Sequence, residues 1–181
     1  MNKRIAVFCG SAKGSRPEYV QAAESLGELF VRENIGLVYG GGSIGLMGVM
    51  ADTMMALGGE VTGVIPQKIF DWEVGHTGIT HLHVVQSMHE RKAMMADLSD
   101  AFIAMPGGIG TLEEIIEVFT WLQLGYHHKA CGFLNVGGYF DHLFAYFDHM
   151  VREGFLSAAT RDLVHVSDSA SSLLSRLITI R

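Results

Sequence analysis

Apolar and polar residues alternate along this chain with two different periods. Short, almost wholly apolar runs of four or five residues recur six times, which is typical of strands buried on both faces of a parallel sheet. These predicted strands span residues 5–9, 36–39, 61–65, 82–85, 101–105 and 131–134. Between and after them, longer stretches with a helical period predict helices at residues 17–33, 46–57, 88–99, 111–124, 140–153 and 169–177.

This alternation predicts an α/β fold, a Rossmann-like doubly wound parallel sheet with helices on both faces. The chain has 181 residues, of which 49% are hydrophobic and 18% charged, and this fits one domain over residues 1–181 with a sizeable core. No repeat, low-complexity segment or linker-like change of composition divides it. Residues 66–80 show no clear period, and we expect a lid or binding loop there.

Charge and cysteine content narrow the choice of partners and compartment. A formal charge of -6 and a pI near 5.8 leave no basic excess for a nucleic-acid backbone or an anionic membrane. We therefore expect a small-molecule partner, no nucleic acid and no membrane. Cys9 and Cys131, the two cysteines, lie at the ends of apolar runs. That placement is typical of buried reduced thiols and favours the cytoplasm.

Three predicted strands run into glycine-rich turns, at residues 10–14, 40–48 and 107–110. Ligands of doubly wound sheets bind beyond the carboxyl ends of the strands, where these turns fall. Glycines let the main chain approach a ligand closely, and the first amides of the following helix are free to bind an anion. We expect a nucleotide or sugar phosphate at this edge. Besides residues 108–111, the candidate phosphate contacts are Gly41, Gly42, Ser43 and Gly45. For any single turn, tight packing between strand and helix is the alternative.

Other cofactor sites fit the sequence less well. Gly40, Gly42 and Gly45 match the dinucleotide pattern G-x-G-x-x-G, but no acid follows about 20 residues later to bind a ribose, and this disfavours NAD. No turn carries the Lys-Ser or Lys-Thr pair of a Walker loop. His81 and His83 alternate on one strand, yet no cysteine or acid at a matching spacing completes a metal site. We expect no metal.

Two charged residues stand out beside the glycine turns. Arg91 falls on the apolar stripe of the helix at 88–99, where a cation needs an anionic or polar partner. That partner is the substrate or a structural acid, unless the side chain extends to the surface. Glu114 follows the third turn, where hydrolysis of a phosphorylated sugar needs a base or a cation stabiliser. The alternative for Glu114 is a capping box, in which Thr111 caps the helix and Glu114 reaches back to its amide.

Five segments of the chain resemble, in order, the LOG (LONELY GUY) family. These are residues 7–11, 37–48 (with GGGSIGLMG), 63–66, 88–92 (MHERK) and 106–114 (PGGIGTLEE). The family comprises the cytokinin riboside 5'-monophosphate phosphoribohydrolases, which are often labelled lysine decarboxylases. The resemblance covers nearly the whole chain. It implies hydrolysis of the N-glycosidic bond of N6-modified AMP, and of AMP itself, to free base and ribose 5-phosphate, without a metal or organic cofactor. It also implies a homodimer with sites near the subunit interface.

The resemblance also implies roles for individual residues. Arg91 and Glu114 fall on the family's catalytic positions. From the chemistry of glycosidic cleavage we expect Glu114 to face the sugar, and Arg91 to face the departing purine or to hold the sugar in line. The implied substrate contacts are Glu73, Lys92, Gly108, Ile109, Gly110, Thr111, Leu112, Glu113 and Thr120. Ile109 departs from the tyrosine that many members carry. The alternative is a non-catalytic nucleotide or molybdenum-cofactor carrier or sensor of the same fold, and the retention of both charged residues favours the enzyme.

Overall fold

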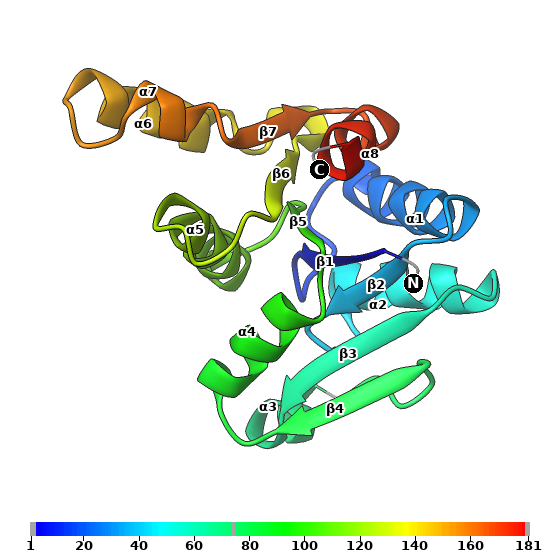
Figure 1. Cartoon of the computed structure of the whole chain (residues 1–181). Helices are drawn as coiled ribbons and strands as arrows, with labels where there is room; N and C mark the ends of the chain where they lie inside the picture. The colour runs from blue at the N-terminus through cyan, green and yellow to red at the C-terminus, as the bar shows by residue number, and fades with distance from the viewer. Residues whose placement is uncertain (1–2, 74, 180–181) are drawn as a thin grey trace.

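A seven-stranded parallel sheet forms the centre of the computed structural model, which describes residues 3–73 and 75–179. All neighbouring strands are parallel. In spatial order the strands are β4 (His81–Val85), β3 (Val61–Pro66), β2 (Gly36–Tyr39), β1 (Arg4–Phe8), β5 (Ala101–Ala104), β6 (Ala130–Leu134) and β7 (Val164–Ser167) (Figure 1). The predicted doubly wound parallel sheet is thereby confirmed.

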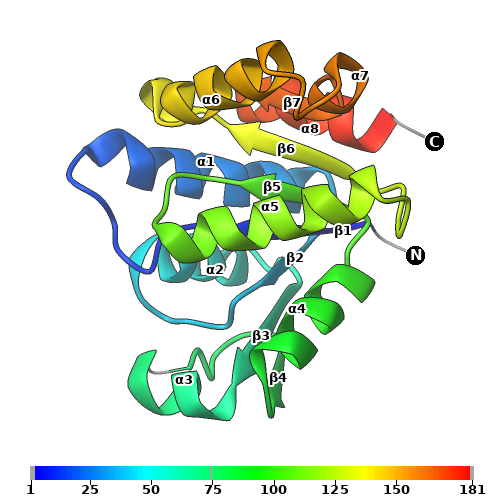
Figure 2. The ribbon, with the colours of Figure 1, turned by 90° about the vertical axis from the view of Figure 1, so that its left-hand side faces the viewer.

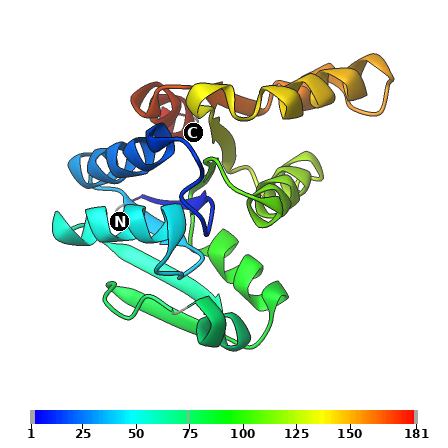
Figure 3. The ribbon, with the colours of Figure 1, turned by 180° about the vertical axis from the view of Figure 1, so that it is seen from behind.

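Helices cover both faces of this sheet (Figures 1 and 3). One face carries α1 (Pro17–Arg32), α2 (Gly45–Ala56) and α8 (Ala170–Thr179), and the other carries α4 (Met88–Asp97), α5 (Ile109–Gln123) and α6 (Asp141–Arg152). Successive strand residues point to opposite faces, so Phe102 and Ile103 of β5 enter two different cores. The five inner strands are largely apolar because both of their faces are covered, whereas the edge strand β4, predicted to be buried, is mostly exposed. None of the described helices combines the length and apolarity that a bilayer span requires.

Four short elements lie outside the predicted set. The expected loop at 66–80 begins with a helix, α3 (Gln67–Glu73), and a 3-10 turn, η1 (Val136–Gly138), follows β6. The chain between α6 and α8 forms α7 (Ala158–Arg161) and β7. Each of these elements is seven residues or shorter, and β7 is an edge strand with only one buried residue. None of these segments has the continuous apolar run or the extended apolar stripe on which the predictions rest, so they were not predicted.

The direction in which the chain adds strands to the sheet reverses after β4. From β1 it winds outward to β4, then returns to pair β5 with the free side of β1. The turns that follow these two strands are consequently neighbours. The Gly10 amide donates to the Pro106 carbonyl at 3.1 Å, and the Met105 amide donates to the Phe8 carbonyl at 2.9 Å. This crevice is the ligand-binding position of doubly wound sheets.

Candidate active site

Helix α4 carries Arg91 to the carboxyl edge of the sheet. The helix begins after Ser87, whose side chain accepts a hydrogen bond from the Glu90 amide at 3.2 Å. The Glu90 carboxylate returns to accept from the Gln86 amide at 2.8 Å, so the first turn is fixed from both sides. Arg91 lies in this turn. Its Nε donates to the Val64 carbonyl of β3 at 3.1 Å, which directs the guanidinium along the end of the sheet.

Arg91 and Glu114 form a nearly buried ion pair. Arg91 Nη1 lies 2.7 Å from Glu114 Oε1, and only 11% of each side chain is exposed. The two residues come from different helices and are 23 positions apart in the sequence. Of the alternatives that the sequence left open for Arg91, the structure shows pairing with an acid of the protein, Glu114. A paired, hydrogen-bonded carboxylate and guanidinium can remain charged at a position where either group alone could not.

The capping box suggested for Thr111 and Glu114 is wrong. Helix α5 begins at Ile109 with Gly108 as its N-cap, so Thr111 is already the third helical residue and is buried. Glu114 does not reach back to an amide but extends to Arg91. The helix begins two residues earlier than predicted because the tightly packed turn after β5 ends at Gly108. An added Cβ on Gly107 would collide with Thr111 Oγ1, so only glycine fits there.

Burial raises the pKa of the Glu114 carboxyl above its ordinary value of 4.5. Arg91 and Lys92 oppose this shift, and the nearby charge of Glu113 adds to it. Cys9 lies close enough for the charge of Glu114, after burial, to raise the pKa of its thiol, so this cysteine is held neutral. The Glu114 carboxyl thus occupies a site of low polarity, where burial shifts its titration toward higher pH.

The N-terminus of α5 offers unpaired amides beside this pair. Gly108 provides no side-chain cap, and the first intrahelical bond is donated by Leu112 to Gly108 at 3.2 Å. Within residues 3–73 and 75–179, the amides of Ile109, Gly110 and Thr111 therefore have no intrahelical acceptor and can bind a ligand. An added Cβ on Gly108 or Gly110 would meet nothing within 4 Å, so the space in front of the turn is open. This is the geometry of an anion site at the positive end of a helix.

One cavity of about 330 Å³ brings the pair and the turn together. Glu114 and Arg91 line it beside Thr111, and the turn after β1 forms the opposite wall. The remaining lining residues are Cys9, Gly10, Ser11, Met47, Ile69, Met88, Gly108, Ile109 and Gly110. Figure 2 looks onto the face of the sheet that carries α4 and α5, the two helices that supply the charged groups. The cavity thus combines an anion-binding end, a carboxylate with a cation, and an apolar part.

Of the second glycine turn, the residues expected to contact phosphate do not line this cavity, although Met47 does. An added Cβ on Gly45 would collide with the Ser11 backbone, and Leu46 donates to the Gly10 carbonyl at 2.9 Å. Gly41 has a positive φ of 76° and packs against Ile65. Gly42 pairs with Gly75. Packing, the alternative that the sequence left open, accounts for these three glycines. Among the described residues that line the cavity, Gly41, Gly42, Ser43 and Gly45 are absent.

Other implied substrate contacts also lie outside the cavity. Lys92 Nζ lies 2.6 Å from Glu113 Oε1 and 3.0 Å from Glu117 Oε1, so it links α4 to α5. The hydrogen bond to Glu113 raises the pKa of Lys92, which keeps it charged. Thr120 is exposed on α5 and donates to the Ile116 carbonyl at 2.7 Å. The side chain of Glu73 lies outside the described residues.

The sequence did not reveal several residues that shape the site. Gly40 is one of them, because an added Cβ there would collide with Arg91 Nη2. Its position directly after a strand was visible, but the side chain that needs the space comes from a helix about 50 residues later. Tyr139 is another, since its hydroxyl holds the turn before α5. No local pattern marks either role.

A family model and several named proteins match this chain over most of its length. A family model described as "Possible lysine decarboxylase" matches residues 47–177. The chain is 49% identical over 175 residues to "Cytokinin riboside 5'-monophosphate phosphoribohydrolase LOG1" of Arabidopsis thaliana, covering 97% of this chain and 82% of that protein. It is also 49% identical to "Probable cytokinin riboside 5'-monophosphate phosphoribohydrolase LOGL5" of Oryza sativa subsp. japonica, covering 97% of this chain and 71% of the rice protein.

Solved structures share the same fold at lower identity. The molybdenum cofactor binding protein from the phototrophic bacterium Rippkaea orientalis superposes with a TM-score of 0.75 at 21% identity, covering 99% of this chain and 98% of that chain. At this identity the likeness establishes the architecture and leaves the ligand open.

Proposed function

Because this chain belongs to the LOG family of cytokinin riboside 5'-monophosphate phosphoribohydrolases, we propose that it hydrolyses the N-glycosidic bond of nucleoside 5'-monophosphates. The substrates are N6-modified adenosine 5'-monophosphates and AMP, and the products are the free base and ribose 5-phosphate. One observation carries the proposal. The buried pair of Arg91 and Glu114 shares a cavity with an uncapped helix N-terminus, so a sugar held by its phosphate would lie beside the carboxylate.

Glu114 is suited to the centre of the reaction. Cleavage of an N-glycosidic bond passes through a ribose with oxocarbenium character, and a carboxylate near the anomeric carbon stabilises that positive charge. The same carboxylate orients the attacking water and accepts its proton. The low polarity around Glu114 strengthens the attraction between carboxylate and developing cation.

Arg91 and the turn at 108–111 complete the mechanism. The departing purine accumulates electron density, and the Arg91 guanidinium offsets it by donating to a ring nitrogen or by holding the sugar in line. The free amides of Ile109, Gly110 and Thr111 bind the 5'-phosphate. Binding at this remote group helps to hold the anomeric carbon against Glu114.

The decisive experiment is incubation of the purified protein with AMP and with isopentenyladenosine monophosphate. We expect free base and ribose 5-phosphate in equal amounts, with adenosine, which lacks the phosphate, cleaved far more slowly. No release from either monophosphate would overturn the proposal. An absorption spectrum of the protein as purified tests the molybdenum-cofactor alternative, because a bound pterin would absorb in the near ultraviolet.

Activity should depend on pH through Glu114. Its carboxylate form is the active one, and burial raises its pKa, so the acid limb of kcat/KM should have its midpoint above pH 4.5. The contribution of Glu114 to stability decreases as pH rises, whereas activity increases. The folded chain holds this proton more tightly than the unfolded chain, so the stabilising contribution is complete below the ordinary pKa and is lost as pH rises through the raised one. Rate profiles from pH 4 to 8 check the activity trend, and an acid limb of kcat/KM with its midpoint at or below pH 4.5 would contradict it. Thermal melts over the same pH range check the stability trend.

We also propose that the chain acts as a homodimer through the exposed face of α5. Ile109 is 82% exposed and borders both the catalytic cavity and a groove that includes Leu112 and Ile116. A second copy seated there would bury this apolar surface and bring its own side chains toward the site, beside Glu113 and Leu112. Light scattering should give twice the chain mass, and Ile116→Arg should give the monomer. A wild-type monomer at micromolar concentration would exclude the dimer.

Cytoplasmic location is a proposal of the same kind. Cys9 and Cys131 are both buried and free, as expected where thiols stay reduced.

A further inference from the structure

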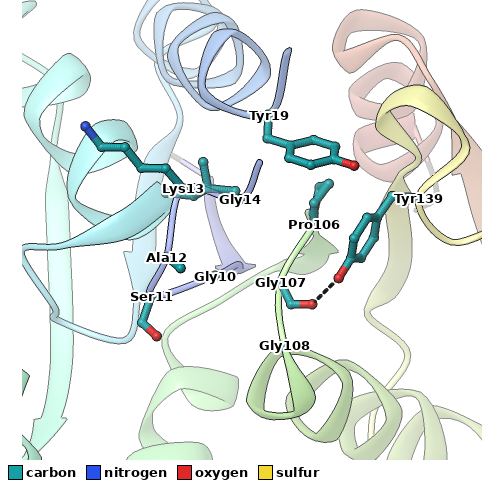
Figure 4. Close-up of a pocket in the computed structure, with 11 residues that line it drawn as sticks. Gly10, Ser11, Ala12, Lys13, Gly14, Tyr19, Pro106, Gly107, Gly108 and Tyr139 are labelled. Atoms are coloured by element: carbon teal, nitrogen blue, oxygen red, sulfur yellow. Dashed lines mark hydrogen bonds between the residues drawn. The ribbon is translucent and has the colours of Figure 1, made fainter. Parts of the chain in front are cut away.

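Tyr139 reaches from the segment after β6 to the turn that precedes α5. Its hydroxyl donates a hydrogen bond to the Gly107 carbonyl at 2.5 Å, across 32 positions of sequence (Figure 4). The ring of Tyr139 is held by two other rings in edge-to-face contact. The centroid of the Tyr139 ring lies 5.7 Å from that of Tyr19 and 5.0 Å from that of Phe140. The hydroxyl is therefore placed by a supported ring, although 42% of the residue is exposed.

This bond acts on the peptide that leads into the anion site. The Gly107 carbonyl belongs to the peptide bond between Gly107 and Gly108, and no described peptide bond is cis. In a trans peptide the carbonyl and the next amide point in opposite directions. Fixing the carbonyl toward Tyr139 therefore turns the Gly108 amide away from Tyr139. Gly108 caps α5 and borders the catalytic cavity, so the orientation of this peptide affects the amides offered there.

Packing holds only one end of this peptide. An added Cβ on Gly107 would collide with Thr111 Oγ1 and approach the Gly10 amide nitrogen to 2.8 Å, so Gly107 has no free space. An added Cβ on Gly108 would meet nothing within 4 Å. A peptide between two glycines rotates at little steric cost. The Tyr139 hydroxyl is thus the described side-chain group that holds the carbonyl of this peptide in one orientation.

We propose that Tyr139 is a positioning residue, which orients the Gly107–Gly108 peptide and thereby sets the affinity of the α5 N-terminus for the 5'-phosphate. The inference rests on the proposed function for the identity of the ligand. Tyr139 touches no reacting atom and acts through the turn. Its expected effect is on binding of the phosphate group and not on the chemistry at Glu114.

The effect should be moderate because solvent reaches the bond. Tyr139 lines a second cavity of about 270 Å³, between Tyr19, Leu46 and the turns after β1 and β5. When the hydroxyl is removed, water can enter this space and hydrogen-bond to the Gly107 carbonyl. Water there is less fixed than a tyrosine hydroxyl, so the peptide regains part of its freedom. We expect phosphate binding to weaken by about 3- to 10-fold, the range of one modest hydrogen bond.

The test compares Tyr139→Phe with Tyr146→Phe in the full chain. Tyr146 is an exposed tyrosine of α6 whose ring contacts that of His149, so its variant controls for loss of a hydroxyl. Inhibition constants for inorganic phosphate and ribose 5-phosphate, and KM for AMP, should rise 3- to 10-fold in Tyr139→Phe alone. The kcat for AMP should change by less than about twofold, as expected for loss of uniform binding. The phenylalanine keeps the ring contacts, and a thermal melt verifies the fold.

The outcomes separate this inference from the proposed function. Phosphate binding can be measured by calorimetry without any turnover. If Tyr139→Phe weakens phosphate binding while the wild-type protein leaves AMP intact, the positioning role stands and the proposed function fails. If AMP is hydrolysed but Tyr139→Phe binds phosphate as the wild type does, this inference alone is overturned. A fall in kcat with unchanged phosphate affinity would also overturn it.

Discussion

Replacing Glu114 by glutamine should lower kcat for AMP hydrolysis by about 10³-fold, the size of effect expected when a charge-stabilising and proton-accepting group is lost. Glutamine keeps the shape of the side chain and can still accept the hydrogen bond from Arg91, which lies at 2.7 Å. The change therefore removes the negative charge with little disturbance of the cavity. KM for AMP should change by less than about threefold, because the phosphate contacts remain.

Stability measurements are needed beside the kinetics. Glu114→Gln leaves the Arg91 guanidinium nearly buried without a counter-charge, although the hydrogen bond to the Val64 carbonyl persists. Because the raised pKa means that the folded chain favours the neutral form of Glu114, the neutral glutamine should leave the free energy of unfolding at pH 7 unchanged or slightly higher. Glu28→Gln is the matched control, since it removes the same charge from the exposed side of α1. A folded Glu114→Gln protein with normal turnover would show that this carboxylate is not catalytic.

Replacing Gly40 by alanine should lower kcat/KM by about 10²-fold, because misplacement of a catalytic group by about 1 Å costs that much. Gly40 ends β2 beside the guanidinium of Arg91, and the added methyl would overlap Nη2. It would also approach Met47 Sδ to 3.2 Å. The end of an arginine side chain can move aside at small cost in stability. The same movement takes the guanidinium away from Glu114.

Gly40→Ala should leave the fold intact, so it tests the position of Arg91 selectively. The φ of Gly40 is outside the positive range, so alanine is tolerated by the backbone. A second readout follows from electrostatics. Arg91 lowers the pKa of Glu114, so its displacement should move the acid limb of the rate profile to higher pH. Gly78→Ala is the control, since its added Cβ would lie 3.5 Å or more from its neighbours. Unchanged kinetics in Gly40→Ala would show that Arg91 need not occupy this position.

Predicted and observed elements agree where the chain has long periodic segments. The six predicted strands and six predicted helices are present, with boundaries that shift by one or two residues. The exceptions are instructive. The start of α5 was placed at Thr111 because threonine followed three residues later by glutamate is a common capping pattern. In the folded chain Glu114 binds Arg91, and the helix begins instead at Ile109.

The glycine turns show a second limit of the sequence. All three turns follow strands, and glycine content does not distinguish a turn that binds a ligand from one that packs closely. Gly45 packs against the backbone of Ser11, whereas Gly108 and Gly110 face open space. The difference depends on which segment lies opposite each turn. That information requires the strand order, in which β5 returns to lie beside β1.

By itself, the sequence determined the order of the six predicted strands and six predicted helices, the burial of the inner strands and the family motifs around Arg91 and Glu114. These features are expressed in residues that are neighbours along the chain, so period and spacing reveal them. Only the tertiary structure decided that Arg91 pairs with Glu114, that Gly40 leaves room for it and that Tyr139 holds Gly107. The physical reason is that each of these contacts joins segments from different strand ends, and they meet only after the sheet has assembled.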